Sequence, residues 1–172
     1  MSYTTIKALW PGEKNENLEE LSNGHGSGPV LWMAISEKYL HDEMAWLHGE
    51  GKKVWSLWKN GAIPKHVRAC LMLTFDRAYV LKKDYLRAAK DIRLSLSELA
   101  IKSGRVNHWP RIAEIFESNS NIPAIGLWCT SVSDDPFEGP WNEKEEKHDP
   151  LDWNTTFDVY KNLDNIPEKV KG

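Results

Sequence analysis

The stretch from residue 64 to residue 101 constrains the fold of this chain most, because it carries two helical patterns in succession. Pro64 suits the start of a helix, and the run Ala69–Leu73 that follows is apolar on nearly every side, which predicts burial. Asp84 can cap a second helix, in which apolar residues recur at three- and four-residue steps. These residues are Tyr85, Ala89, Ile92, Leu96 and Leu99. We expect an antiparallel αα-hairpin over 64–101 with a turn near Val80–Lys83; one continuous helix is the alternative.

Shorter patterns outline the rest of the chain. Alternating residues predict a strand near 3–10, and a β-favouring apolar stretch predicts a second strand near 124–132. Between them, residues 13–28 are expected to form a polar loop with one helical turn. Helices are expected to begin at Pro29 and at Pro110, and a last one is expected over roughly 154–163. That last helix would be capped by Asp152 or Asn154.

The size and composition of the chain fit one folded unit. Its 172 residues, 41% hydrophobic and 27% charged, are typical of a globular domain. A chain of this length buries roughly two thirds of its unfolded surface. Because two strands alone are only marginally stable, helices must cover them. We therefore predict a predominantly helical α+β fold, with residues 1–172 as a single domain. The nine tryptophans belong in its core or on a recognition surface.

The charges are segregated along the sequence. The formal net charge is only −3, which argues against nucleic-acid binding, but residues 65–105 carry +6 and residues 134–153 carry −6. No apolar run approaches the ~20 residues that a bilayer requires, and no secretory signal is visible. Cys70 and Cys129 are too few and too far apart for a disulfide framework, so we expect reduced thiols in the cytoplasm.

The segment 134–153, "DDPFEGPWNEKEEKHDPLDW", is both acidic and aromatic. One interpretation is a loop whose aromatic side chains are pinned to the core while its carboxylates stay in water. The other is a binding site in which an aromatic anchor and the acidic residues engage a basic protein partner. The residues predicted for this partner site are Phe137, Trp141, Glu143, Glu145, Glu146 and Trp153.

A glycine-rich loop, "NGHGSGP", precedes the helix predicted to begin at Pro29. Helix N-termini present free N–H groups to anions, so this loop is a candidate anion site. Its residues are Gly24, His25, Gly26, Ser27 and Gly28. The pattern matches neither a P-loop nor a dinucleotide fingerprint, and an ordinary surface loop is the alternative.

Other candidates have simpler explanations. His66 and Cys70 share a helical face, but Cys70 begins an apolar run and is expected to be structural. Lys83, Arg87 and Lys90 form a basic face, which has no interleaved aromatic residues for nucleic-acid bases to stack on. We find no pattern that predicts a metal site or a cofactor.

Two functional hypotheses remain. The first is a non-catalytic cytoplasmic protein that binds another protein through its acidic, aromatic surface, as an adaptor or an inhibitor of the immunity-protein type. The second is an enzyme or small-molecule-binding domain with an anion site at Gly24–Pro29. The acidic segment is expected either to fold back over the basic face of residues 83–90 or to project from it.

Overall fold

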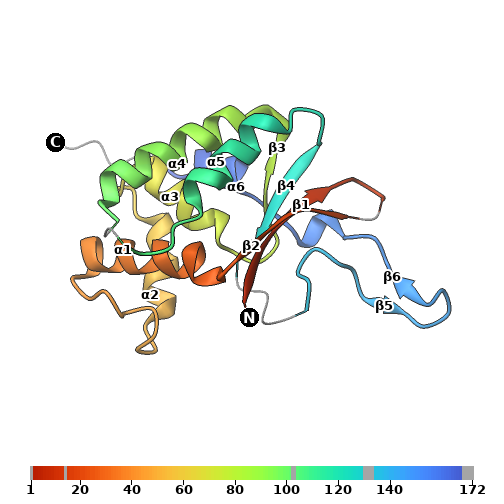
Figure 1. Cartoon of the computed structure of the whole chain (residues 1–172), viewed down its shortest axis with the longest axis horizontal. Coiled ribbons are helices and arrows are strands. Elements are labelled where there is room, and N and C mark those ends of the chain that lie inside the picture. The colour runs from red at the N-terminus through yellow and green to blue at the C-terminus, as the bar shows by residue number, and fades with distance from the viewer. Residues whose placement is uncertain (1, 14, 102–103, 130–133, 168–172) are drawn as a thin grey trace.

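The computed structural model describes residues 2–13, 15–101, 104–129 and 134–167. A five-stranded mixed sheet with strand order β2-β1-β4-β3-β7 is packed against helices (Figure 1). The strands are β1 Tyr3–Leu9, β2 Glu16–Ser22, β3 Ala78–Leu81, β4 Ala124–Trp128 and β7 Phe157–Asp158. The predicted α+β class is confirmed, as are the strand near 3–10 and the start of the strand near 124. The predicted extension over residues 130–132 lies outside the described residues.

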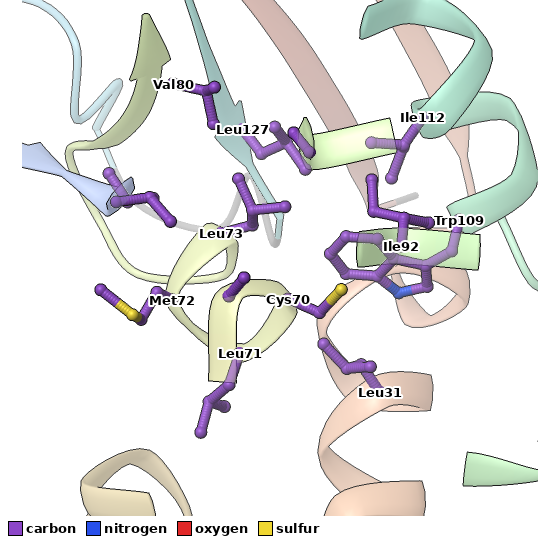
Figure 2. Close-up of a cluster of buried hydrophobic side chains, with 14 of the residues drawn as sticks. Leu31, Cys70, Leu71, Met72, Leu73, Val80, Ile92, Trp109, Ile112 and Leu127 are labelled. Atoms are coloured by element: carbon purple, nitrogen blue, oxygen red, sulfur yellow. The ribbon is translucent and has the colours of Figure 1, made fainter. Parts of the chain in front are cut away.

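The described residues also form six α-helices. They are α1 Gly28–Leu40, α2 Gly51–Ser56, α3 Lys65–Leu73, α4 Tyr85–Leu99, α5 Trp109–Ser118 and α6 Val159–Asp164. Helices α3, α4 and α5 pack on one another and bury one face of the sheet. Figure 2 shows this core, in which Cys70 and Leu73 of α3, Ile92 of α4 and Trp109 of α5 converge on Leu127 of β4.

The helical pair predicted over 64–101 is present, but its connection differs from the prediction. Instead of a turn near Val80–Lys83, residues 78–81 form strand β3, which pairs with β4 and β7. The short sequence "AYVL" is equally compatible with a helix end, and only its tertiary pairing selects the strand. Asp84 occupies the N-cap position of α4 as expected, although its side chain makes no capping hydrogen bond.

Two further expectations were wrong. Residues 16–22, expected within a polar loop, form β2 and pair with β1 across a register shift between Ile6 and Lys7. The last helix begins at Val159, not near residue 154, because the Asp158 carboxylate accepts the Lys161 backbone N–H at 3.0 Å and caps it there. Asp152 instead caps the short 3₁₀ turn η4, Trp153–Thr155, through the Asn154 N–H at 2.9 Å.

The second face of the sheet is covered by the acidic segment. A small apolar cluster on this face joins Leu9 of β1 and Ala124 of β4 to Phe137 and Leu151 of the segment. The molecule therefore has three layers: helices, sheet and the segment 134–153. Most carboxylates of the segment face outward, whereas its buried apolar residues face the sheet.

Candidate functional site

The first anchor of the acidic segment is Phe137, which is 0% exposed. Its ring lies on the backbone of Gly126 in β4. A Cβ atom added at Gly126 would lie 2.3 Å from Phe137 Cζ, so a side chain there would displace the ring. Gly126 is thus the floor of a socket for Phe137, and the sheet face accepts the segment at this point.

The second anchor is an ion pair between Lys7 of β1 and Asp135. The two side chains are only 6% and 10% exposed. Lys7 Nζ also donates to Asn17 Oδ1 at 2.7 Å, and Asp135 Oδ1 accepts the Phe137 backbone N–H at 2.9 Å. Removing one partner from a buried pair typically costs 3–5 kcal/mol, about the scale of the loss of a core side chain. Lys7 and Asp135 therefore fasten the start of the segment to the sheet.

Beyond these anchors the chain forms a β-hairpin from β5, Trp141–Asn142, and β6, Lys147–His148. The Asn142 side chain organises its turn. Asn142 Oδ1 accepts the backbone N–H groups of Lys144 and Glu145, each at 3.1 Å, and its Nδ2 donates to Asp149 Oδ1 at 3.0 Å. A locally hydrogen-bonded turn of this kind holds the hairpin in one conformation.

Trp141 is the exposed aromatic residue of the hairpin, with 56% of its surface accessible. Its ring meets the His148 ring edge-on, with centroids 5.1 Å apart at 74°. His148 is held in turn, because its Nδ1 lies 2.9 Å from the Gly139 carbonyl and its Nε2 lies 3.3 Å from a Glu138 carboxylate oxygen. The indole is oriented by its neighbours while much of it faces solvent.

A groove of about 490 Å³ runs between the hairpin and the β1–β2 turn. Its lining includes the exposed Trp141, and the buried Phe137 and Leu151 lie beneath it. Four carboxylates line it against one lysine and one histidine. The carboxylates belong to Glu13, Glu138, Glu146 and Asp149. The lining of the groove thus combines an exposed aromatic side chain with four carboxylates, which we call its negative rim.

The structure separates the residues predicted for the partner site. Phe137 is buried, so it anchors the segment and is not available to a partner. Trp153 also packs inward, with its ring edge-on to Tyr79 of β3 at 4.9 Å. Trp141 is exposed, as are the turn residues Glu143, Glu145 and Glu146. The first interpretation, a loop pinned to the core by aromatic side chains, therefore describes the base of the segment, whereas partner binding at its tip stays a prediction.

The glycine loop has a packing role. Added Cβ atoms would lie 3.1 Å from the Cys129 carbonyl oxygen at Gly24, 2.7 Å from His108 Cδ2 at Gly26 and 2.9 Å from Trp32 Cζ2 at Gly28. Ser27 is buried, and its carbonyl accepts the Trp109 Nε1–H at 2.9 Å. His25 is exposed. The backbone N–H groups of Gly24, Gly26 and Ser27 already donate to carbonyls, at 3.0, 2.9 and 3.2 Å, so the geometry does not favour an anion there.

Of the two arrangements left open for the acidic segment, the fold-back is not the one seen: among the described residues, no ion pair joins 134–153 to Lys83, Arg87 or Lys90. Arg87 instead makes a two-bond contact with Asp164 of α6, at 2.6 and 2.9 Å, and its guanidinium carbon lies 4.2 Å from the centre of the Tyr160 ring. These contacts keep the pKa of Asp164 well below its usual value. Figure 1 shows the β5–β6 hairpin at one end of the molecule and α4 toward the other.

Cys70 and Cys129 lack the properties of reactive cysteines. Burial raises the pKa of each thiol to about 12, which suppresses the thiolate at neutral pH. For Cys70 a hydrogen bond from Ser95 acts in the opposite direction, but burial dominates. The geometry therefore gives no support to activation of Cys70 by His66.

Sequence reasoning missed a second hollow, a cavity of about 510 Å³ bordered by Trp32, Trp55 and Trp58. The high number of tryptophans in the sequence is compatible with such a cavity, but it does not indicate which of them line it.

Comparisons with protein-family models, with curated proteins and with solved structures find no match for this chain. Within the described residues, no helix combines the length and apolar character needed to cross a membrane. Nor do the described residues contain a group of three or more His, Cys, Asp or Glu side chains arranged to hold a metal ion.

Proposed function

We propose that this chain is a non-catalytic binding protein whose acidic hairpin docks a basic segment of another protein. The observation that carries the proposal is Trp141, which is 56% exposed beside a groove with a negative rim. Tryptophan is enriched among the residues that dominate binding energy, and exposed carboxylates steer a basic partner toward it.

The way the hairpin is held supports the proposal. A binding loop that is already ordered loses less conformational freedom when its partner docks. The buried Phe137 and the Lys7–Asp135 pair fix the base of the hairpin, and Asn142 fixes its turn. The site is thereby preorganised, although its tip carries little apolar packing of its own.

The competing function, an enzyme or ligand-binding domain with an anion site at Gly24–Pro29, has weaker support because the N–H groups of Gly24, Gly26 and Ser27 already donate to carbonyls. The proposal includes a cytoplasmic location, which is supported by Cys70 and Cys129 being free thiols. An adaptor and an inhibitor of a basic protein use the same surface chemistry, so the proposal covers both.

The test is a titration with fluorescently labelled arginine-rich peptides of about ten residues, some with and some without a central leucine, followed by anisotropy. Trp141→Ala should weaken binding of the leucine-containing peptides by about 30-fold, the size typical of an interface hot spot. Changing Glu143, Glu145 and Glu146 together to Gln should slow association and reduce its salt dependence.

Each hairpin variant has a control elsewhere on the surface, one that removes three carboxylates and one that removes an exposed apolar side chain. Glu37, Glu114 and Glu117 are exposed on α1 and α5, and changing all three to Gln alters the net charge by the same amount. Leu86→Ala removes another exposed apolar side chain, 74% accessible, from α4. If these controls weaken binding as much as the hairpin variants do, the hairpin is not the binding site.

A further inference from the structure

The tryptophan-lined cavity lies between α1, the end of α3, and the segment formed by α2 and the following 3₁₀ turn η2, Leu57–Lys59. Its volume, about 510 Å³, falls within the range of small-molecule sites. The residues that define its chemistry are Trp32, Lys52, Trp55, Trp58, Lys59 and Phe75. None of these residues lines the groove beside the acidic hairpin, so the cavity is a separate feature.

The aromatic walls of the cavity are fixed by contacts behind them. Trp32 and Trp55 meet edge-on with ring centroids 5.9 Å apart, and Trp32 Nε1 donates to Thr74 Oγ1 at 2.9 Å. On the other side, the rings of Trp58 and Phe75 both contact Phe157, at 5.5 and 5.9 Å. The rings are therefore positioned before any ligand arrives, and their remaining surfaces suit a flat aromatic group.

The cationic side of the cavity comes from one helical face. Lys52, Ser56 and Lys59 lie four and three residues apart along α2 and the 3₁₀ turn η2, Leu57–Lys59. Within the described part of the chain, neither lysine has a carboxylate partner. The neighbouring Lys53, by contrast, pairs with Glu50 and does not line the cavity.

One further charge limits what the cavity accepts. Asp76, just beyond α3, also lines it, so the two lysines leave a formal excess of one positive charge. A ligand with one negative group matches this excess, whereas the several phosphate charges of a nucleotide exceed what it can balance. Apolar walls with few polar groups are typical of sites that orient a small ligand.

We propose that this cavity binds a small aromatic monoanion of the aryl-carboxylate type. The aromatic ring lies among Trp55, Trp58 and Phe75, and the carboxylate accepts from Lys52 and Lys59. This site does not depend on the acidic hairpin, and it adds a small-molecule ligand to a protein proposed to bind another protein.

The experiment uses the whole chain and two probes of equal shape, 2-naphthoate and the neutral 2-naphthylmethanol. Binding is followed by titration calorimetry. Lys52→Gln and Lys59→Gln should each weaken the binding of 2-naphthoate by about tenfold, which is the scale of a lost charge-assisted contact. The affinity for 2-naphthylmethanol should not change. Lys52, Lys53 and Lys59 are all exposed. Lys53→Gln therefore serves as the matched control and should change the affinity for neither probe.

Trp55→Leu should weaken the binding of both probes, because it removes an aromatic side chain that lines the cavity and changes no charge. Denaturation midpoints of all variants show whether each is folded, and the lysine variants decide the question if Trp55→Leu is not. Equal affinity for the two probes, equal effects of Lys52→Gln and Lys53→Gln, or no binding of 2-naphthoate at millimolar concentration would each overturn the proposal. Trp141→Ala should bind 2-naphthoate normally, which separates this result from a failure of the hairpin hypothesis.

Discussion

Phe137→Ala offers the sharpest test of how the acidic segment is held. The ring is 0% exposed and fills the socket above Gly126, so its removal loses both buried apolar surface and packing. Changes of this kind cost about 3–5 kcal/mol. At roughly 2–4 °C per kcal/mol for a chain of this size, Tm should fall by roughly 6–20 °C. The loss has an upper limit, because the segment can detach locally before the rest of the protein unfolds.

A second substitution, Gly126→Ala, tests whether Phe137 stabilises the protein through its contact with Gly126. Gly126→Ala alone should be destabilising, since the new Cβ would lie 2.3 Å from Phe137 Cζ. In the Phe137→Ala background the same methyl group enters empty space and removes a glycine from a strand interior, which is worth roughly 0.5–1 kcal/mol. The effect of Gly126→Ala should therefore change sign between the two backgrounds, a coupling expected of two residues in contact.

The assay is urea unfolding followed by tryptophan fluorescence, with limited proteolysis to report cleavage within 134–153. Phe137→Ala should increase cleavage there even where the helices remain folded. Trp141→Ala is the control, because an exposed aromatic side chain contributes little to stability. A loss below 1 kcal/mol for Phe137→Ala, with unchanged proteolysis, would refute the conclusion that Phe137 fastens the segment to the sheet.

Three further predictions concern the helical layer. Leu71→Ala should lower the free energy of unfolding by about 2–5 kcal/mol, because Leu71 is 1% exposed, and urea unfolding will measure the loss. Cys70 and Cys129, whose burial raises each pKa to about 12, should react slowly with a thiol reagent at pH 8 and rapidly in denaturant; fast labelling of the folded protein would contradict their burial. Arg87 lowers the pKa of Asp164, so this carboxylate stabilises the fold above its unfolded pKa of about 3.9, and that contribution is lost as the pH falls toward the folded value. Asp164→Asn should thus lower the free energy of unfolding by up to about 1 kcal/mol at pH 7 and by progressively less below pH 4. If the denaturation midpoints of Asp164→Asn and of the unchanged protein differ by the same amount at every pH, the contact is not stabilising.

The elements with clear periodicity were predictable from sequence, and those set by pairing were not. Helices α3 and α4 carry their own apolar patterns, so their existence follows from residues 64–101 alone. Strand β2, "ENLEELS", has a charged and mostly exposed sequence that resembles a loop. It becomes a strand because β1 offers it a ladder of backbone partners, and such non-local pairing leaves little local signal.

The candidate site was predictable as a segment but not as a set of roles. Composition identified 134–153 as both acidic and aromatic, yet Phe137, Trp141 and Trp153 are equivalent at that level. They differ in the residue that each one contacts: Phe137 packs on Gly126, and Trp153 packs on Tyr79. Trp141 projects from a two-strand hairpin instead. These partners are far away in sequence, so periodicity within the segment carries no information about them.

The charged character of β2 has a consequence for how copies of the protein meet. β2 is an outer strand of the sheet, and an unpaired strand edge is where a second chain can add and begin aggregation. Glu16 and Glu20 on this strand would be brought against the same strand of another copy, so like charges oppose the addition, whereas the charge of Glu19 is paired with Arg111. The other outer strand, β7, is only two residues long and offers few hydrogen bonds to continue the sheet. Acid weakens the first of these barriers by neutralising carboxylates, so intermolecular β-structure should form more readily at low pH than at neutral pH.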